Sequence, residues 1–417
     1  MLTDVIVNID FRRRNMYTLI IKRWWIIMNV IDNRPIIEKE AYDLIVVGGG
    51  VAGISAAVSA SRHGIKVLVL EKNTALGGLA TVGLISYYEP LCNGKGKQLV
   101  FGIGEELIKL AIKDGYDSLS EGWKTGVGEK WEYASFYSPT SFTMALDEYL
   151  LQSGAKVRFD SRAVSPVMDG KVCKGVIVES KGGREFYPTK ALIDATGDAE
   201  MCDKAGIPTI IGTNYMLGMA HYTNRKLASD YANGGHTYKF RKWLYAVDDT
   251  NKGENKVHTG VTAEDITDFV ITGRKAVLQK IREEDKDTRE VLTLPLMPQY
   301  RTIRHIVGSK IFRAVLGEEQ DDAIGTCGNW RKAGLQYQIP YGCLIHNDYP
   351  NIWAVGRIVS TDEEMGWEVT RVIPACTLTG QAGGTAVALC LKHGVSAQDI
   401  DLKELQKTLA EDGVVIE

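Results

Sequence analysis

The pattern of hydrophobic and polar positions predicts a β-α-β unit that begins near residue 42. Residues 43–47 and 66–70 are short runs dominated by apolar side chains, which is typical of strands buried on both faces of a parallel sheet. Between them, residues 54–63 are rich in alanine and end at Gly64, and glycine is the residue favoured just past a helix. We therefore predict a strand, a helix and a second strand in this order.

Further along the chain, the pattern predicts a mixture of strands and helices. We expect helices at 139–154 and 374–391, strands at 156–159 and 351–356, and a series of strands over 162–192 broken at 169–170 and 182–183. Residues 206–335 are more charged and are predicted to be largely helical. Within them, residues 262–265 resemble a helix capping box, and apolar residues then recur at helical spacing.

A glycine motif directly follows the first predicted strand. In Gly48-x-Gly50-x-x-Gly53, the first glycine makes a tight turn, the second lets the backbone approach a pyrophosphate, and the third lets the helix pack on the strand. The phosphates would then lie at the helix N-terminus. Glu71 ends the second strand, where a carboxylate can accept hydrogen bonds from a ribose. This combination predicts a dinucleotide-binding site.

Additional small-residue turns follow the second strand in a characteristic order. They are residues 77–81 (GGLAT), 195–198 (ATGD), 353–357 (WAVGR) and 374–385 (PACTLTGQAGGT). Their order and spacing resemble the flavoprotein superfamily with a glutathione-reductase-like FAD domain. More specifically, four segments are similar to signatures of the FAD-dependent oxidoreductase family, with His305 in place of a second arginine. These segments are 304–308 (RHIVG), 339–345 (IPYGCLI), 356–360 (GRIVS) and 371–376 (RVIPAC).

The resemblance, which covers roughly residues 42–394, implies FAD as the cofactor. It implies that the FAD-binding residues are Gly48, Gly50, Val51, Ala52, Gly53, Glu71, Lys72, Gly77, Gly78, Leu79, Ala163, Thr196, Gly197, Asp198, Gly356, Arg357, Gly380, Gln381, Ala382 and Gly383. The helix at 374–391 would direct its N-terminus at the flavin pyrimidine ring, with Gly380, Gly383 and Gly384 permitting close approach. The chain departs from many relatives at Arg357, where they carry an aspartate that contacts the ribityl chain.

The same resemblance implies an α/β fold with two parts. One is a Rossmann-like FAD-binding domain, made of a parallel sheet with a β-meander, and the other is an inserted α-rich or mixed substrate (cap) domain. The expected division is an N-terminal extension at 1–41, the FAD-binding domain at 42–205 and 336–395, the cap domain at 206–335, and a C-terminal helical tail at 396–417. Met28 is a possible true start, and we expect residues 1–27 to be dispensable for folding.

Two neighbouring residues are the main candidates for catalysis. Arg304 and His305 fall in a family signature outside the FAD motifs, so Arg304 could orient an oxygen and His305 could transfer protons near neutral pH. The alternative is that both only tie the cap to the FAD domain. Arg301 would lie one turn away if this stretch were helical. Tyr337, Tyr341 and His346 are weaker candidates, and Cys92 is a candidate for a covalent or redox role beside the flavin.

The motifs also favour a particular reaction scheme. Residues 101–104 (FGIG) lack a preceding strand and a third glycine, so we expect no separate nicotinamide site. No two cysteines lie closer than fourteen residues, which excludes a C-x-x-C disulfide reductase. We therefore predict an oxidoreductase that exchanges a hydride directly between FAD and a small polar molecule. Two alternatives remain: a flavin subunit that passes electrons to a membrane or protein acceptor, and an FAD-binding RNA-modification or interaction protein.

Composition and charge exclude some classes of binding partner. The 417 residues include 49 basic and 52 acidic side chains, and a formal charge of −3 provides no global field to recruit nucleic acid. No eighteen apolar residues run together, so no membrane span is predicted. The histidines and cysteines are too scattered to predict a metal site, and reduced thiols favour a cytoplasmic protein. The oligomeric state does not follow from the sequence.

Overall fold

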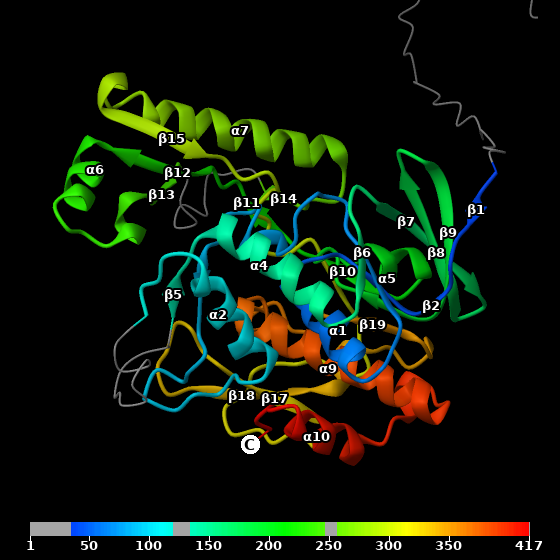
Figure 1. Cartoon of the computed structure of the whole chain (residues 1–417). Helices are drawn as coiled ribbons and strands as arrows, with labels where there is room; N and C mark the ends of the chain where they lie inside the picture. The colour runs from blue at the N-terminus through cyan, green and yellow to red at the C-terminus, as the bar shows by residue number, and fades with distance from the viewer. Residues whose placement is uncertain (1–34, 120–133, 247–256, 417) are drawn as a thin grey trace, which may run out of the picture. The chain divides into compact units, whose positions relative to one another are not determined.

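The computed structural model describes residues 35–119, 134–246 and 257–416. The expectation that residues 1–27 are dispensable therefore lies outside the described residues, as does most of the predicted extension at 1–41. The predicted β-α-β unit is present as strand β2 (Tyr42–Val47), helix α1 (Val51–Arg62) and strand β3 (Val67–Leu70). The α/β fold with a mainly parallel central sheet is thus confirmed (Figure 1).

The central sheet consists of parallel strands in the order β6, β3, β2, β9 and β19. The strands added here are β6 (Lys156–Arg158), β9 (Gly183–Asp194) and β19 (Ile352–Ala354). β9 pairs with β2 on one side and with β19 on the other, so the C-terminal part of the chain adds the last strand of the parallel sheet. This pairing brings the strand predicted at 351–356 next to a segment about 160 residues earlier in the sequence.

Alternate residues of the central strands enter two different hydrophobic cores. In β2, Leu44 and Val46 pack with the helices on one face, whereas Ile45 and Val47 pack on the opposite face. The helical face carries α1, α2 (Ile103–Lys113), α4 (Pro139–Gln152) and α9 (Ile373–His393). The opposite face carries a meander of β7 (Arg162–Asp169), β8 (Val172–Ser180) and the first half of β9, together with α5 (Glu200–Ala205). Burial on both faces explains the nearly continuous apolar runs in the sequence.

Helices α1 and α9 pack against each other through glycines. A Cβ atom on Gly380 would overlap the carbonyl oxygen of Ala52, and one on Gly384 would overlap that of Ala56. Because both contact positions advance in the same direction along the two helices, α1 and α9 run roughly parallel and begin at the same end of the sheet. Figure 1 shows the two helices side by side in front of β19. The glycine-rich sequence of α9 therefore has a packing reason.

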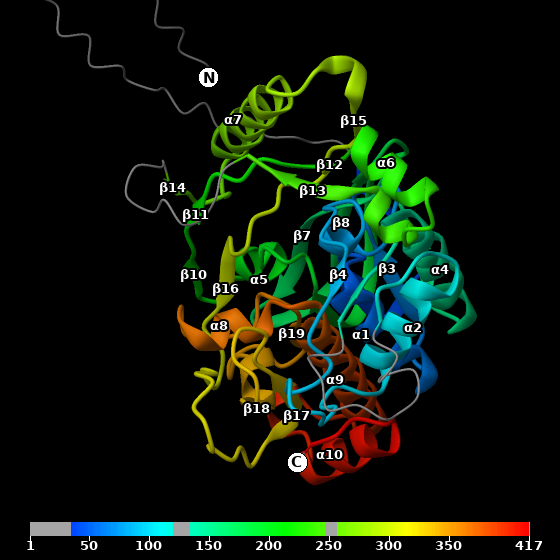
Figure 2. The same cartoon turned by 90° about the vertical axis from the view of Figure 1, so that its left-hand side faces the viewer.

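Residues 206–335 were predicted to be largely helical, and over 207–316 the structure corrects this prediction. They contain many short antiparallel strands beside two main helices, α6 (Arg225–Ala232) and α7 (Ala263–Ile281). The strands are β10 (Thr209–Ile211), β11 (Asn214–Tyr215), β12 (Met219–Asn224), β13 (Lys242–Tyr245), β14 (Val257–His258), β15 (Arg289–Thr293) and β16 (Arg304–Ile306). β12 is buried over nearly its whole length, whereas β13 has one buried residue, Leu244, and exposed ends. Figure 2 shows α7 above β12 and β13, at the opposite end from α10.

Two paired strands lie on either side of the domain boundary predicted at residue 335. Strand β17 (Ala323–Gly328) precedes the expected boundary at residue 335 and pairs with β18 (Gln336–Pro340), which follows it. The boundary therefore falls between two paired strands, and the division into domains stays a prediction. The other elements are β1 (Ile37–Glu38), β4 (Tyr87–Tyr88), β5 (Ser135–Phe136), α8 (Met365–Thr370) and α10 (Leu402–Glu411).

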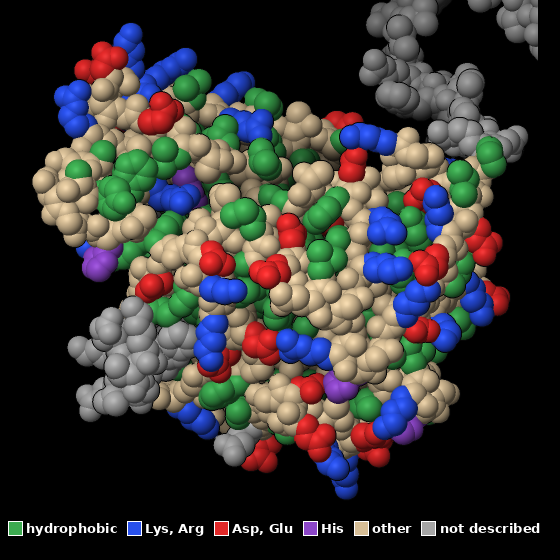
Figure 3. All heavy atoms as spheres, viewed as in Figure 1, with side chains coloured by type: hydrophobic (Ala, Val, Ile, Leu, Met, Phe, Trp, Pro, Cys, Tyr) green, Lys and Arg blue, Asp and Glu red, His purple; other side chains and the backbone are tan. Residues whose placement is uncertain are grey.

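Charged side chains are mixed on the surface. On the face seen in Figure 3, Lys and Arg side chains are interspersed with Asp and Glu side chains over the central helices and the meander. Ion pairs such as Arg62 with Glu106, 2.7 Å apart, form part of this surface. Within the described residues, none of the helices has the length and apolar character needed to cross a membrane.

Candidate functional site

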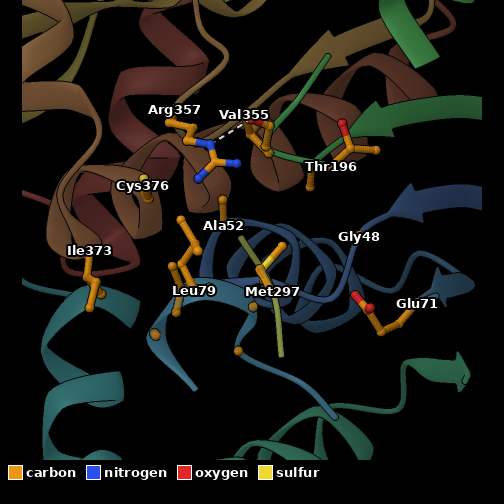
Figure 4. A pocket seen from close by; sticks show the side chains of 18 of the residues that line it. Gly48, Ala52, Glu71, Leu79, Thr196, Met297, Val355, Arg357, Ile373 and Cys376 are labelled. Atoms are coloured by element: carbon orange, nitrogen blue, oxygen red, sulfur yellow. Dashed lines mark hydrogen bonds between the residues drawn. The ribbon is translucent and has the colours of Figure 1, made fainter. Parts of the chain in front are cut away.

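A large cavity lies where the central parallel strands end. Its empty volume is about 1380 Å³, part of which is open to solvent. Residues at the carboxyl ends of four strands line it: Val47 after β2, Glu71 after β3, Thr196 after β9 and Val355 after β19. In the view of Figure 4, Gly48 and Glu71 lie toward one end, and Ile373 and Cys376 lie toward the other. The carboxyl edge of a doubly wound sheet is the usual location of a nucleotide site.

The glycine turn after β2 forms one wall of the cavity. Gly48 has a φ of 106°, and a Cβ atom there would overlap the carbonyl oxygen of Ala195, so this position requires glycine. Gly50 differs because its φ is −71° and a Cβ atom would meet no protein atom within 4 Å. The open space at Gly50 is the cavity itself. The absent side chain at Gly50 therefore leaves room for a ligand and is not needed for packing.

The carboxylate of Glu71 is held rigidly beside this turn. Its Oε2 accepts a hydrogen bond from the Gly49 amide at 2.8 Å, and its Oε1 accepts from the backbone and side-chain amides of Asn73 at 2.7 and 2.8 Å. A carboxylate has about four acceptor positions, so one remains for a ligand. Asn73 also lines the cavity and was missed in the sequence analysis, although its position two residues after Glu71 was a usable signal.

Two helix N-termini face the same cavity. Helix α1 has Gly50 as its N-cap and α9 has Val372, and neither N-terminus is capped by a side chain. Both N-cap residues line the cavity, as do Val51 and Ile373, the first residues of the two helices. Uncapped N–H groups and the positive ends of two helix dipoles make this cavity suited to an anionic or electron-rich ligand.

Most of the residues expected to bind the cofactor line this cavity. They are Gly48, Gly50, Val51, Ala52, Glu71, Lys72, Gly77, Gly78, Leu79, Ala163, Thr196, Gly197, Gly356 and Arg357. The structure also adds residues that the sequence analysis did not select as cofactor-binding. They are Asn73, Ile85, Tyr87, Glu89, Ser161, Arg162, Glu200, Met297, Trp330, Arg371, Val372, Ile373 and Cys376.

Six of the expected residues do not line the cavity and have other structural partners. Gly53 packs against the backbone of Gly48, and Gly380 packs against α1. Gln381 caps α2, because its Oε1 accepts a hydrogen bond from the Ile103 amide at 2.9 Å. Ala382 and Gly383 are buried within α9, and Asp198 pairs with Arg357. The sequence motif identified the helix correctly, but only its first turn reaches the cavity.

Asp194 fixes the backbone next to the Thr196–Gly197 turn. This fully buried carboxylate accepts hydrogen bonds from the amides of Thr196, Met201 and Cys202 and from the Thr196 hydroxyl, at 2.7–3.0 Å. Burial raises the pKa of Asp194, and the hydrogen bonds oppose that shift. Through these contacts, the end of β9 and the start of α5 are held together beside the cavity.

A second cavity adjoins the first. It has an empty volume of about 1390 Å³ and shares with the first cavity Leu79, Ile85, Tyr87, Glu89, Arg357 and Arg371. Its other walls include Trp243 and Tyr245 of β13 and the segment 299–301. The strand region 207–316 and the central sheet therefore both contribute to it.

Arg357 lies in the wall between the two cavities and is held by three hydrogen bonds. Its Nε donates to the Gly197 carbonyl at 2.6 Å, its Nη1 to the Tyr300 carbonyl at 2.9 Å, and its Nη2 to Asp198 at 2.8 Å. Only 9% of its side chain is exposed. The arginine that departs from the family pattern thus joins the turn after β9 to residue 300 of the adjoining region.

The predicted catalytic pair lies outside both cavities, and its role in catalysis stays a prediction. Neither Arg304 nor His305 lines either cavity. The two residues belong to strand β16, which pairs with β10, so the stretch is not helical. Arg304 lies 3.7 Å from Asp203, and His305 is buried, with burial lowering its pKa. Arg301, which was considered only as a neighbour of Arg304, does line the second cavity.

The weaker candidates are also outside the two cavities. Tyr337, Tyr341 and His346 do not line either one, and neither does Cys92. Cys92 is fully buried, and burial raises the pKa of its thiol. Cys376 does line the first cavity, but burial raises its pKa to about 12. These cysteines therefore give no support to a covalent or redox role.

The fold and the cavity together define a nucleotide-binding α/β protein of the flavoprotein kind, and comparison with known proteins gives the family. A family model described as "FAD dependent oxidoreductase" matches residues 43–266 and 317–409. The chain belongs to this family. It is thus an FAD-dependent oxidoreductase, and FAD is its cofactor.

Individual relatives are distant. The chain is 27% identical over 207 residues to a digeranylgeranylglycerophospholipid reductase of Methanoculleus marisnigri, covering 44% of this chain and 46% of that protein. It is 24% identical over 195 residues to a second such reductase, from Methanosphaerula palustris, with 44% and 46% covered. A thioredoxin reductase of Ureaplasma parvum is 24% identical over 194 residues, with 45% and 62% covered. The chain thus spans about half the length of the curated relatives it matches.

Solved structures support the fold alone. The p-nitrophenol 4-monooxygenase PnpA of Pseudomonas putida aligns over 89% of this chain and 86% of that one, with a TM-score of 0.50 and 11% sequence identity. At this level of identity the similarity concerns the arrangement of strands and helices, and the substrate must be argued from this chain's own residues.

The geometry of the first cavity fits FAD. The open space at Gly50, the uncapped N-terminus of α1 and the carboxylate of Glu71 match what a pyrophosphate and a ribose require. The uncapped N-terminus of α9 at the other end of the cavity suits a group that gains negative charge on reduction.

His221, which is hydrogen-bonded to a residue that lines the second cavity, should make the free energy of unfolding depend on pH. His221 is buried, and its Nε2 accepts a hydrogen bond at 2.9 Å from Nε1 of Trp243, so the ring must be neutral. Burial, and secondarily the charge of Arg241, lowers the pKa of His221 to about 4. Below pH 6.5, the ordinary pKa of histidine, His221 binds a proton in the unfolded chain but not in the folded chain. The free energy of unfolding therefore decreases as the pH falls from 6.5 to 4.

We expect a loss of about 3 kcal/mol from His221 across this range, measured by denaturant unfolding between pH 7 and pH 4. The matched variant is His221→Gln, whose side-chain oxygen can still accept from Trp243 but does not titrate. The variant should lose less stability than the wild type over the same range. Identical pH profiles for the two proteins would contradict the assignment.

Proposed function

We propose that this oxidoreductase exchanges a hydride directly between FAD and a small polar organic molecule that occupies the second cavity. The observation that carries the proposal is the wall shared by the two cavities, which includes Leu79, Tyr87 and Arg357. A molecule in the second cavity would lie next to whatever fills the first. FAD, when bound, supplies the capacity to accept or donate two electrons as a hydride.

In this proposal, the chain binds FAD with the residues that line the first cavity. The turn from Gly48 to Gly50 and the start of α1 would take the pyrophosphate, and Glu71 would bind a ribose. The start of α9, at Val372 and Ile373, would lie against the flavin. Leu79, which lines both cavities, would exclude water from the region between them, and Trp330 would cover part of the first cavity.

The proposal predicts how the flavin responds to reductants. Outside the central sheet, the strands of the described residues pair only antiparallel, so none of these pairs provides a second parallel nucleotide-binding sheet. We expect NADH and NADPH to reduce the bound flavin slowly, with a rate proportional to their concentration.

The measurement is anaerobic stopped-flow absorbance at 450 nm with NADH, NADPH and a panel of small hydroxy acids, amino acids and polyols. The proposal expects fast, saturable reduction by at least one compound of the panel. Fast, saturable reduction by a nicotinamide, with none by the panel, would contradict it. Reduction or oxidation only by a protein or quinone partner would favour the electron-transfer alternative.

A further inference from the structure

Aromatic side chains are concentrated in the second cavity. Of the fourteen described residues that line it, four are aromatic: Tyr87, Trp243, Tyr245 and Tyr300. Over the whole chain only 8% of the residues are aromatic, so the cavity is clearly enriched in them. Large, flat and mostly apolar side chains favour a ligand with an organic body of some size.

Strand β13 presents two of these rings to the cavity. Successive side chains of a strand point to opposite faces, so Trp243 and Tyr245 share one face and Leu244 lies on the other. Leu244 packs in a core with Val277 and Ile281 of α7. The opposite face, with Trp243 and Tyr245, lines the cavity, and 40% of Tyr245 is exposed.

Trp243 is held in place by a residue of the neighbouring strand. His221 of β12 lies directly opposite it in the antiparallel pair, and the Trp243 Nε1 donates a hydrogen bond to His221 Nε2 at 2.9 Å. His221 is only 1% exposed, so this contact is anchored in the interior. The indole N–H is the single polar group of a tryptophan side chain. Because that group is satisfied, the rest of the ring is left for apolar contacts.

Three rings surround Trp243 without stacking on it. The ring centroids of Phe136, Tyr87 and Tyr245 lie 5.5, 6.5 and 5.9 Å away, and their planes are inclined to the indole by 72°, 86° and 75°. All three contacts are therefore of the edge-to-face kind. Trp243 itself is half-buried, so part of its ring is accessible. A flat ligand ring would add the offset parallel contact that aromatic pairs also favour.

The aromatic wall continues into the wall that the two cavities share. Tyr87 contacts Trp243 and lines both cavities, as do Leu79 and Ile85. A ring that rests on Trp243 would therefore lie next to the first cavity.

We propose that the second cavity selects small molecules that carry an aromatic ring, which stacks on Trp243, and that His221 is a positioning residue for Trp243. This inference rests on the proposed function, because it names the substrate class of the same cavity. It goes further in requiring that a molecule with a saturated ring and the same polar group binds less tightly.

The test uses the FAD-loaded protein and two matched pairs of neutral probes. They are benzamide with cyclohexanecarboxamide, and benzyl alcohol with cyclohexylmethanol. The members of a pair share a polar group and have no charge, so they differ only in the ring. The saturated ring is the larger one, so hydrophobic burial alone predicts that it binds at least as tightly.

Stacking on Trp243 predicts the opposite order. We expect the aromatic member of each pair to bind at least about threefold more tightly, as measured by the change in the visible flavin spectrum and by the shift in melting temperature. If the saturated member of either pair bound as tightly as the aromatic one, or if no probe bound, the inference would be overturned.

Substitutions of Trp243 locate the ring. Trp243→Leu should remove the preference, so that the two members of a pair bind about equally, whereas Trp243→Phe should keep most of it. The matched control is Tyr231→Leu on α6, at an exposed aromatic residue that contacts Phe240 and lines neither cavity. This control should show the full preference. An unchanged preference in a Trp243→Leu protein with full FAD content would overturn the inference.

Two variants of His221 test the positioning role. His221→Gln keeps an acceptor for the Trp243 N–H and should keep the preference, whereas His221→Leu removes the acceptor and should reduce it. A purely structural role would change the melting temperature but not the ratio of the two dissociation constants. Loss of the preference in His221→Gln, or its full retention in His221→Leu, would overturn the positioning role. The first of these outcomes is readable even if His221→Leu does not fold.

Comparison with flavin reduction separates this inference from the proposed function. A wild-type protein that contains FAD and prefers the aromatic probes, but is reduced fast only by NADH, would contradict the proposed hydride donor and leave the aromatic site supported. A protein that is reduced fast by aliphatic compounds of the panel and shows no preference between the probes would contradict the aromatic site and leave direct hydride exchange supported.

Discussion

Replacing Gly50 with valine is expected to give a folded protein that lacks FAD. The backbone at Gly50 has φ and ψ of −71° and 175°, which any residue can adopt, and a Cβ atom there meets no protein atom within 4 Å. The added side chain would instead occupy the space where the pyrophosphate is proposed to approach α1. We expect an affinity for FAD at least about 100-fold lower, which corresponds to about 2.7 kcal/mol.

The measurement is the ratio of absorbance at 450 and 280 nm after purification, followed by titration of the FAD-free protein with FAD. The control is Gly182→Val in the turn before β9, an exposed site whose Cβ atom would make only ordinary contacts, 3.4 Å or more from its neighbours. That variant should retain its flavin. A Gly50→Val protein that is fully loaded with FAD would show that the pyrophosphate does not lie at this turn.

The sequence allowed prediction of the parts of the fold that depend on local signals. The helices predicted at 139–154 and 374–391 are α4 and α9, and the breaks predicted at 169–170 and 182–183 are the two turns of the meander. Glycine, proline and hydrophobic periodicity act within a few residues, so they are visible without the tertiary structure. The same holds for the glycine turn from Gly48 to Gly53.

Long-range packing explains where the prediction was wrong or incomplete. Gly380 and Gly383 look like cofactor glycines in the sequence, but their neighbours in the structure are Ala52 and Val355, which lie far away along the chain. The strands over 207–316 are two to six residues long, too short to show a clear period of two. Arg301 and Arg371 line the same cavity only because separate segments converge on it, which no local pattern encodes.

The second large effect is expected from Arg357, whose removal should destabilise the fold. Replacing it with methionine deletes three hydrogen bonds and leaves Asp198, with 13% of its side chain exposed, without its cation. Removing one partner of a buried ion pair costs about 3–5 kcal/mol, because the other charge stays buried and unpaired. We expect a loss of this size in denaturant unfolding of the FAD-free protein, where flavin binding does not contribute.

A double-mutant cycle distinguishes the ion pair from the packing of the arginine. If Asp198 and Arg357 stabilise the protein as a pair, then Asp198→Asn combined with Arg357→Met should cost about 1–3 kcal/mol less than the sum of the single variants. The exposed pair of Lys226 and Asp230 provides the control, since Lys226→Met should cost less than about 0.5 kcal/mol. Strict additivity at Asp198 and Arg357 would mean that the backbone carbonyls of Gly197 and Tyr300 are the partners that matter. In that case Arg357 would act as a clamp between the turn after β9 and the wall of the second cavity, and its loss should weaken binding in both cavities equally.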